Sequence, residues 1–147
     1  MNLKVLLGVA LTCMVTGISA EEIIIEMKNV GAEGAMVFEP AVVKAEVGDT
    51  VTFVPTDMGH NSELVAGLAP QGADSWKGEL GQPVSVTLKK EGVYVYQCLP
   101  HTIMAMVGVL VAGQPTNLDV IMKDSAPLKA KFVMNKERLD NYLQQSK

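Results

Sequence analysis

The chain has 147 residues, of which 48% are hydrophobic and 19% are charged, and its 12 basic and 16 acidic side chains give a formal net charge of −4 at pH 7. This length allows one compact domain with a sizeable core and is short for two. The acidic balance excludes an overall basic footprint for nucleic acid, so we predict no nucleic-acid partner.

The first 20 residues predict an export signal. Lys4 precedes an apolar run over residues 5–15, and the segment ends on Ser19 and Ala20 before two glutamates. This arrangement is typical of a signal peptide with cleavage after Ala20, and the run is shorter than the roughly 20 apolar residues that span a membrane. We therefore predict an exported, periplasmic protein with no membrane insertion after signal removal. The mature chain would lose one basic residue, Lys4, and would carry 11 minus 16, or −5, charges.

Residues 21–112 predict an all-β domain. Short apolar runs are broken by Gly, Pro, Asn and Asp about every 8–12 residues, which is the pattern of an antiparallel sandwich or barrel. The stretch 58–82 has no clear period, and we interpret it as a long connection with one helical turn near residues 64–68. Strands are predicted at residues 23–28, 37–39, 41–46, 50–55, 84–88, 92–97 and 106–111.

Residues 113–147 are more polar and predict helices. Thr116 is placed to cap a first helix that runs to about residue 123, with Leu118 and Ile121 on one face. After a break at residues 125–127, a second helix is predicted over residues 128–145. We interpret the tail as a helical extension packed on the same domain, not as a separate partner module. The apolar stripe of the second helix would consist of Ala130, Val133, Met134 and Leu139.

Cysteine usage raises a chemical question. Cys13 lies in the signal segment, so Cys98 would be the single cysteine of the mature chain and could form no intramolecular disulfide. A free thiol in an oxidising compartment is prone to oxidation and mispairing, so we expect Cys98 to be buried or occupied by a ligand.

The segment 98–106 concentrates metal-binding side chains between two predicted strands. It contains Cys98, His101, Met104 and Met106, and the one other histidine, His60, lies 38 positions upstream of Cys98 just past a strand. Two imidazoles and a thiolate in a trigonal arrangement, with a long axial thioether, form the blue-copper electron-transfer site. We therefore predict a single copper ion bound by His60, Cys98, His101 and Met106. 

Other interpretations of these residues are open at this point. Taken singly, Cys98 could be a core thiol, the histidines structural or surface residues, and the methionines core packing. A copper chaperone or store, a thiol enzyme using Cys98 and His101, and zinc in the same ligands are alternative functions. Two histidines cannot supply the further centres of a multicopper oxidase. The convergence of every mature Cys and His on one ligand set favours the copper site.

These residues lie within longer segments that resemble the small bacterial cupredoxins, and among them the pseudoazurin family. The resemblance implies a Greek-key cupredoxin β-sandwich with two C-terminal α-helices, and it places the copper ligands on His60, Cys98, His101 and Met106. It further implies a carrier of single electrons with a cytochrome donor and a periplasmic reductase such as copper nitrite reductase as acceptor. We expect it not to be an enzyme, because the methionine ligand would leave no open position for a substrate. We expect a monomer, because both partners must reach the same small face. The matching segments are residues 31–40 (GAEGAMVFEP), 48–51 (GDTV), 59–61 (GHN), 98–101 (CLPH), 104–107 (MAMV) and 117–119 (NLD).

Two neighbours of the predicted ligands are assigned supporting roles. Asn61 is placed to tie the two copper loops together by hydrogen bonds, and backbone N–H groups near the sulfur of Cys98 would tune the potential. Met36 is expected to pack beside the ring of His101.

One departure from the family concerns charge. Lysines typically surround the exposed copper edge, whereas Val30, Met58 and Gln97 stand at such positions here and Lys77 remains. We therefore expect electron transfer that depends weakly on ionic strength. The docking face is predicted to be apolar, with Met58, Pro100, Ile103 and Met104 around an exposed edge of His101.

Overall fold

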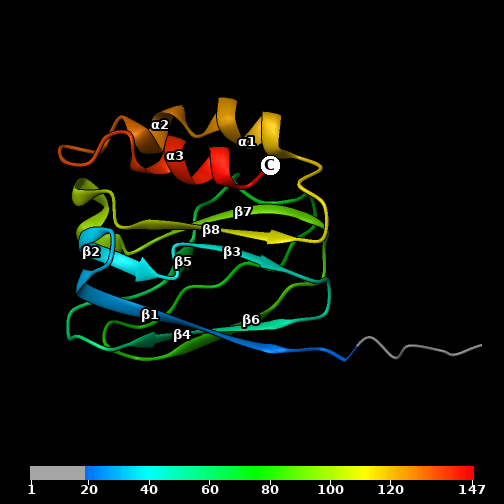
Figure 1. Ribbon diagram of the computed structural model, residues 1–147, viewed down its shortest axis with the longest axis horizontal. Helices are drawn as coiled ribbons and strands as arrows, with labels where there is room; N and C mark the ends of the chain where they lie inside the picture. Colours follow the sequence, from blue (N-terminus) through cyan, green and yellow to red (C-terminus); the bar gives the residue numbers. More distant parts are fainter. Residues whose placement is uncertain (1–18) are drawn as a thin grey trace, which may run out of the picture.

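A computed structural model describes residues 19–147, so residues 1–18 of the predicted signal segment lie outside the described range. Figure 1 shows two sheets packed face to face and a layer of helices covering one of them. The strand order is β2-β1-β4-β6 in the first sheet and β3-β8-β7-β5 in the second. Within this range no helix has the length and apolar character needed to cross a membrane.

Seven of the eight strands among residues 19–147 correspond to the seven predicted from the sequence, and the β-sandwich class is confirmed. Alternation explains the match, since in β4 the inward Val51 and Phe53 are fully buried between partly exposed neighbours. The strands are β1 (Glu22–Gly31), β2 (Gly34–Glu39), β3 (Val42–Ala45), β4 (Thr50–Pro55), β5 (Glu63–Leu64), β6 (Val84–Thr87), β7 (Gly92–Gln97) and β8 (Val107–Ala112).

The sheets are mixed, which differs from the antiparallel pattern predicted. β1 pairs with β4 in parallel, and β3 pairs with β8 in parallel. The chain leaves the first sheet after β2, forms β3 in the second, and returns to place β4 beside β1. This crossing between sheets brings together loops that are distant in sequence.

The connection 58–82 also differs from the prediction. No helical turn forms near residues 64–68; the short strand β5 pairs with β7, and a turn follows that is closed by the Leu68 N–H and the Val65 carbonyl. A strand of two residues shows no alternation in a sequence. It exists because the end of β7 offers it hydrogen-bonding partners.

β7 and β8 are buried on both faces. Tyr94 and Tyr96 of β7 face the core between the sheets, while Val93 and Val95 face a second core beneath the helices. Complete burial of side chains of this size contributes about 1.5–3 kcal/mol each. The helical layer therefore completes the burial of these two strands (Figure 1).

The tail contains three short helices where two were predicted: α1 (Leu118–Asp124), α2 (Ala126–Lys129) and α3 (Arg138–Gln145). Leu118 and Ile121 are buried, as predicted for α1. The N-cap of α1 is Asn117 and not Thr116, and the Asn117 side chain bonds the N–H and carbonyl of Val93 at 2.6 and 3.0 Å.

The predicted helix over residues 128–145 is interrupted after α2. The N–H groups of Val133 and Met134 bond the Ile103 carbonyl at 2.8 and 3.2 Å, so they are not available to a helix. Ala130, Val133 and Met134 are exposed, which contradicts the predicted apolar stripe at these three positions, whereas Leu139 is buried.

Candidate metal centre

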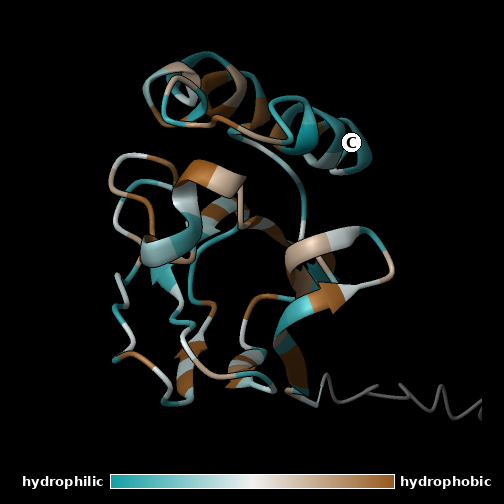
Figure 2. Ribbon diagram, turned by 90° about the vertical axis from the view of Figure 1, so that its left-hand side faces the viewer, coloured by the Kyte–Doolittle hydropathy of each residue, from teal (hydrophilic) through white to brown (hydrophobic). Residues whose placement is uncertain are grey.

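Two loops meet at one end of the sandwich, which Figure 2 views face on. His60 lies in the loop that follows β4, and Cys98 follows β7 directly. His101 lies in the 3₁₀ segment η1 (Leu99–Met104), whose backbone departs from helical angles at His101 itself. The loop is closed by backbone bonds from the N–H of Cys98 to the Met106 carbonyl (2.9 Å) and from the N–H of Met106 to the His101 carbonyl (3.2 Å).

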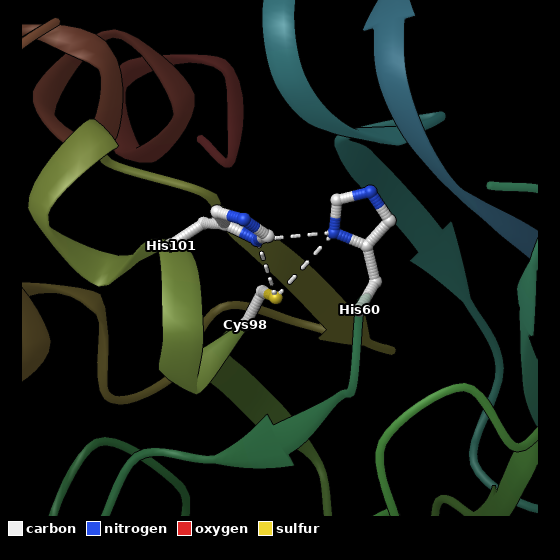
Figure 3. A group of neighbouring side chains, drawn as sticks. All are labelled: His60, Cys98 and His101. Atoms are coloured by element: carbon white, nitrogen blue, oxygen red, sulfur yellow. Dashed lines mark hydrogen bonds between the residues drawn. The ribbon is translucent and has the colours of Figure 1, made fainter. Parts of the chain in front are cut away.

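The side chains of His60, Cys98 and His101 converge on one point (Figure 3). The two Nδ1 atoms are 3.2 Å apart, and the Cys98 Sγ lies 3.7 Å from Nδ1 of His60 and 3.4 Å from Nδ1 of His101. Bonds of about 2.0–2.3 Å from a central ion, as known for zinc with imidazole and thiolate, give a trigonal triangle with edges of roughly 3.5–3.8 Å. The observed edges are close to this size, so the three side chains fit a metal ion.

Hydrogen bonding sets the orientation of His60. Its Nε2 lies 2.9 Å from the Asn29 side-chain oxygen, so Nε2–H donates there and Nδ1 keeps its lone pair for a ligand. Burial lowers the pKa of His60, the electrostatic effect of the neighbouring His101 acts in the same direction, and Asp57 opposes them. Asn29 was missed at the sequence level because it lies 31 positions away on β1.

Cys98 is fully buried. Burial raises the pKa of its thiol, while hydrogen bonds from the backbone N–H groups of Asn61 and His101 lower it. These N–H groups stabilise negative charge on the sulfur, and their tuning of the reduction potential stays a prediction.

Asn61 joins the two loops, as predicted. Its side-chain oxygen accepts the N–H of Leu99 at 2.8 Å, and its side-chain nitrogen donates to the Gly78 carbonyl at 3.2 Å. Because Asn61 follows His60 and Leu99 follows Cys98, this one amide fixes the relative position of the two proposed ligands.

The two methionines of the loop differ in burial. Met106 is fully buried in the same core cluster as Cys98, whereas Met104 is partly exposed. The assignment of Met106 as a ligand stays a prediction. Met36 packs against that cluster, and its contact with the ring of His101 also stays a prediction.

The surface around the site is largely as expected. Met58 is 83% exposed, Ile103 is 57% exposed, and Pro100 is exposed as well. His101 is half-buried. Val30 and Lys77 are exposed as well. Gln97 differs, because it is buried: its amide donates to Glu63 and its oxygen accepts the Thr102 hydroxyl. It is therefore no part of a docking face, whereas Leu99, 52% exposed, adds to the apolar surface.

Comparison with known proteins agrees with this geometry. Residues 25–113 match the model of copper binding proteins of the plastocyanin/azurin family. A pseudoazurin of Methylorubrum extorquens is 47% identical over 95 residues, 65% of this chain and 64% of that protein. A pseudoazurin of Paracoccus pantotrophus is 42% identical over 77% of this chain and 79% of its own. The crystal structure of the Hyphomicrobium denitrificans pseudoazurin superposes with a TM-score of 0.76 at 42% identity, over 84% of this chain and 97% of that one.

The sandwich and its His-Cys-His triangle thus define a cupredoxin, a carrier protein with a single type 1 copper ion that cycles between Cu(I) and Cu(II). Within the cupredoxins, the chain belongs to the pseudoazurin family. It is a blue-copper electron carrier and not an enzyme, and it exchanges electrons with redox partners.

Proposed function

We propose that copper would be held by Nδ1 of His60, Nδ1 of His101 and Sγ of Cys98, with the thioether of Met106 as the fourth ligand. The observation that carries this proposal is the convergence of two imidazole nitrogens and one buried thiol within 3.2–3.7 Å of one another. Such a donor set suits copper, and an axial methionine would leave no open position for a substrate.

The protein's role in the redox step is to hold these donors still. The bound copper supplies the one-electron chemistry. The Asn29 side chain fixes the His60 ring, and Asn61 fixes the spacing of the two loops. The half-buried ring of His101, surrounded by exposed apolar side chains, is the proposed route for electrons to and from the surface.

We further propose an exported carrier: residues 1–20 are removed after Ala20, and a periplasmic monomer remains. Its cupredoxin domain would span residues 21–112, with the helical extension of residues 113–147 packed on β7 and β8. The basis for export is the sequence pattern before Glu21, and the basis for a monomer is that donor and acceptor must both reach one small face.

The partners we propose are a cytochrome donor and a periplasmic reductase, such as copper nitrite reductase, as acceptor. Exposed Met58, Leu99 and Ile103 offer an apolar face for brief docking of either one. Rapid mixing of the reduced carrier with purified copper nitrite reductase tests the acceptor. Electron transfer no faster than with an unrelated acceptor would reject that partner and leave the copper site unaffected.

The ligand set is tested by the visible spectrum of the Cu(II)-loaded protein. An intense thiolate-to-copper band near about 600 nm that bleaches with ascorbate is expected. Cys98→Ser should abolish it, and Met106→Leu should change the potential while the band persists. Met104→Leu is the matched control and should match the parent. A spectrum and potential changed by Met104→Leu but not by Met106→Leu would reject Met106 as the axial ligand.

A further inference from the structure

Arg138, the first residue of α3, places its guanidinium against the loop that ends at Met106. It is the only arginine in the sequence, and it is 8% exposed. Each nitrogen of the fork faces carbonyl oxygens: Nη1 donates to Met36 (3.0 Å), Ala105 (3.2 Å) and Met104 (3.5 Å), and Nη2 donates to Ala35 (3.2 Å) and Glu33 (3.4 Å).

The guanidinium contacts two separate parts of the chain. Residues 33–36 belong to the β1–β2 hairpin, and residues 104–105 immediately precede Met106. Among residues 19–147, the ion pairs formed by basic side chains do not include Arg138. The nearly buried charge is thus balanced by backbone carbonyl dipoles, and a planar fork suits several fixed acceptors better than a flexible ammonium does.

The contacts coincide with unusual backbone. Within the described range, the non-glycine residues with positive φ are Met36 (51°), Ala105 (56°) and Asn135 (51°). The carbonyls of Met36 and Ala105 accept from the Arg138 fork, and the Asn135 carbonyl accepts the backbone N–H of Arg138 at 2.9 Å. A residue other than glycine is strained in the left-handed region and persists there where its surroundings fix it.

Asn135 supports the same turn from the tail. Its side-chain nitrogen donates to the Met104 carbonyl at 3.2 Å. The tail segment before α3 and the first residue of α3 together bind the last two carbonyls before Met106.

We infer that Arg138 is a positioning residue of the copper site: its guanidinium holds the left-handed turn at Ala105 and so sets how close the thioether of Met106 stands to the Cys98 and histidine donors. The inference rests on the proposed ligand role of Met106. It gives the helical extension a function at the metal centre in addition to covering β7 and β8.

The test compares Arg138→Met, which keeps the aliphatic stem and removes the fork, with Arg138→Lys, which keeps the charge. Lys129→Met is the matched control, because it removes the 2.7 Å ion pair between α2 and Asp140 of α3 without touching the loop. The readouts are the ratio of the two thiolate-to-copper bands of the Cu(II) protein, and amide hydrogen exchange of Ala105 and Met106 in the metal-free protein.

Arg138→Met should change the band ratio and speed exchange at Ala105 and Met106 by about tenfold, with exchange in β4 unchanged. Arg138→Lys should lie between this variant and the parent, and Lys129→Met should match the parent. Band ratio and exchange of Arg138→Met equal to the parent's would overturn the inference. A band ratio and exchange in Arg138→Lys equal to the parent's would also overturn the inference, because a positive charge without the planar fork would then suffice. If Arg138→Met does not fold, the same two measurements on Arg138→Lys test the inference.

The metal-free exchange separates this inference from the ligand proposal. Faster exchange at Ala105 with an unchanged spectrum would mean that Arg138 holds the turn but that the turn does not control the metal, which overturns the inference. A parent protein without the band near about 600 nm would instead reject the copper ligand set.

Discussion

The hydroxyl of Tyr96 is buried without a hydrogen-bond partner among residues 19–147. Burial raises the pKa of this phenol far above its ordinary value, so it stays neutral. A β-carbon on Gly108 would lie 2.3 Å from the Tyr96 Oη, so the hydroxyl stands directly over the bare glycine of β8. An unpaired buried hydroxyl is a net cost to folding.

Tyr96→Phe should therefore stabilise the protein by about 1 kcal/mol. The matched control is Tyr94→Phe on the same strand, because the Tyr94 hydroxyl donates to the Lys90 carbonyl at 2.6 Å and its loss should destabilise by a similar amount. Urea unfolding of both variants measures whether each substitution raises or lowers the free energy of unfolding. A lower urea midpoint for Tyr96→Phe would contradict the prediction.

A second prediction concerns the side-chain amide of Asn61. Asn61→Ala leaves the N–H of Leu99 and the carbonyl of Gly78 without their partner, which should cost about 1–3 kcal/mol. Because the amide links the two ligand loops, the reduction potential and copper retention should change as well. Thermal unfolding, voltammetry and dialysis against a chelator measure the three effects.

Ser62→Ala is the control for Asn61→Ala. Ser62 is the next residue and is fully buried, but its hydroxyl accepts the indole N–H of Trp76 at 3.0 Å and does not reach the ligand loop. It should lower stability and leave the potential unchanged. Equal potentials in parent and Asn61→Ala would remove the linking role of Asn61.

At the scale of elements, Asp49 ties the start of β1 to the turn between β3 and β4. Its carboxylate accepts the N–H of Glu21 and the N–H of Glu46, each at 2.8 Å. These two bonds, that of Glu21 foremost, hold the pKa of Asp49 below its ordinary value. A carboxyl group with a lowered folded pKa stabilises the fold above its unfolded pKa, and the gain is lost as pH falls through the folded pKa.

Asp49→Asn should therefore lower stability at pH 7 by about 1–2 kcal/mol. The difference from the parent should begin to shrink below about pH 4, where the unfolded chain takes up a proton at this carboxyl group and the folded chain, with its lowered pKa, still does not. Asp74→Asn is the control, since its ion pair with Lys89 is exposed and such pairs contribute little. Urea midpoints from pH 3 to pH 7 measure the trend, and a difference that grows as pH falls would have the wrong sign.

Some strands of the fold could be predicted from the sequence, and some segments could not. β4 and β7 were predicted at their observed bounds because alternating or continuous burial leaves a pattern in the residues themselves. β5 and the loop at Val133 could not be predicted, because partners far along the chain, Gln97 and Ile103, supply their hydrogen bonds. The same holds in the site: His60, Cys98 and His101 were identifiable by chemistry, whereas Asn29 and Arg138 act through contacts that only the fold creates.

The whole molecule combines a negative net charge with an apolar face at the copper end. Met58, Leu99 and Ile103 are exposed there, and Val30 is 72% exposed on the adjoining β1 strand. Long-range steering needs clustered charge of one sign, and salt screens such charge within about 8–10 Å. Docking through apolar contact is screened much less.

The rate of electron transfer to copper nitrite reductase should therefore change less than about threefold between low and high ionic strength. Met58→Lys places a positive charge on the face and should make the rate fall more steeply with salt when the partner's docking face is acidic. Val47→Lys is the matched control, because Val47 is 45% exposed and lies in the turn before β4, at the opposite end of that strand from Met58. Val47→Lys adds the same charge to the molecule away from the apolar face, so the electron-transfer rate should depend on salt about as it does in the parent. Stopped-flow measurement of the electron-transfer rate against ionic strength, for the three proteins, tests the prediction. A steep salt dependence already present in the parent would mean that charge, and not the apolar face, brings the partners together.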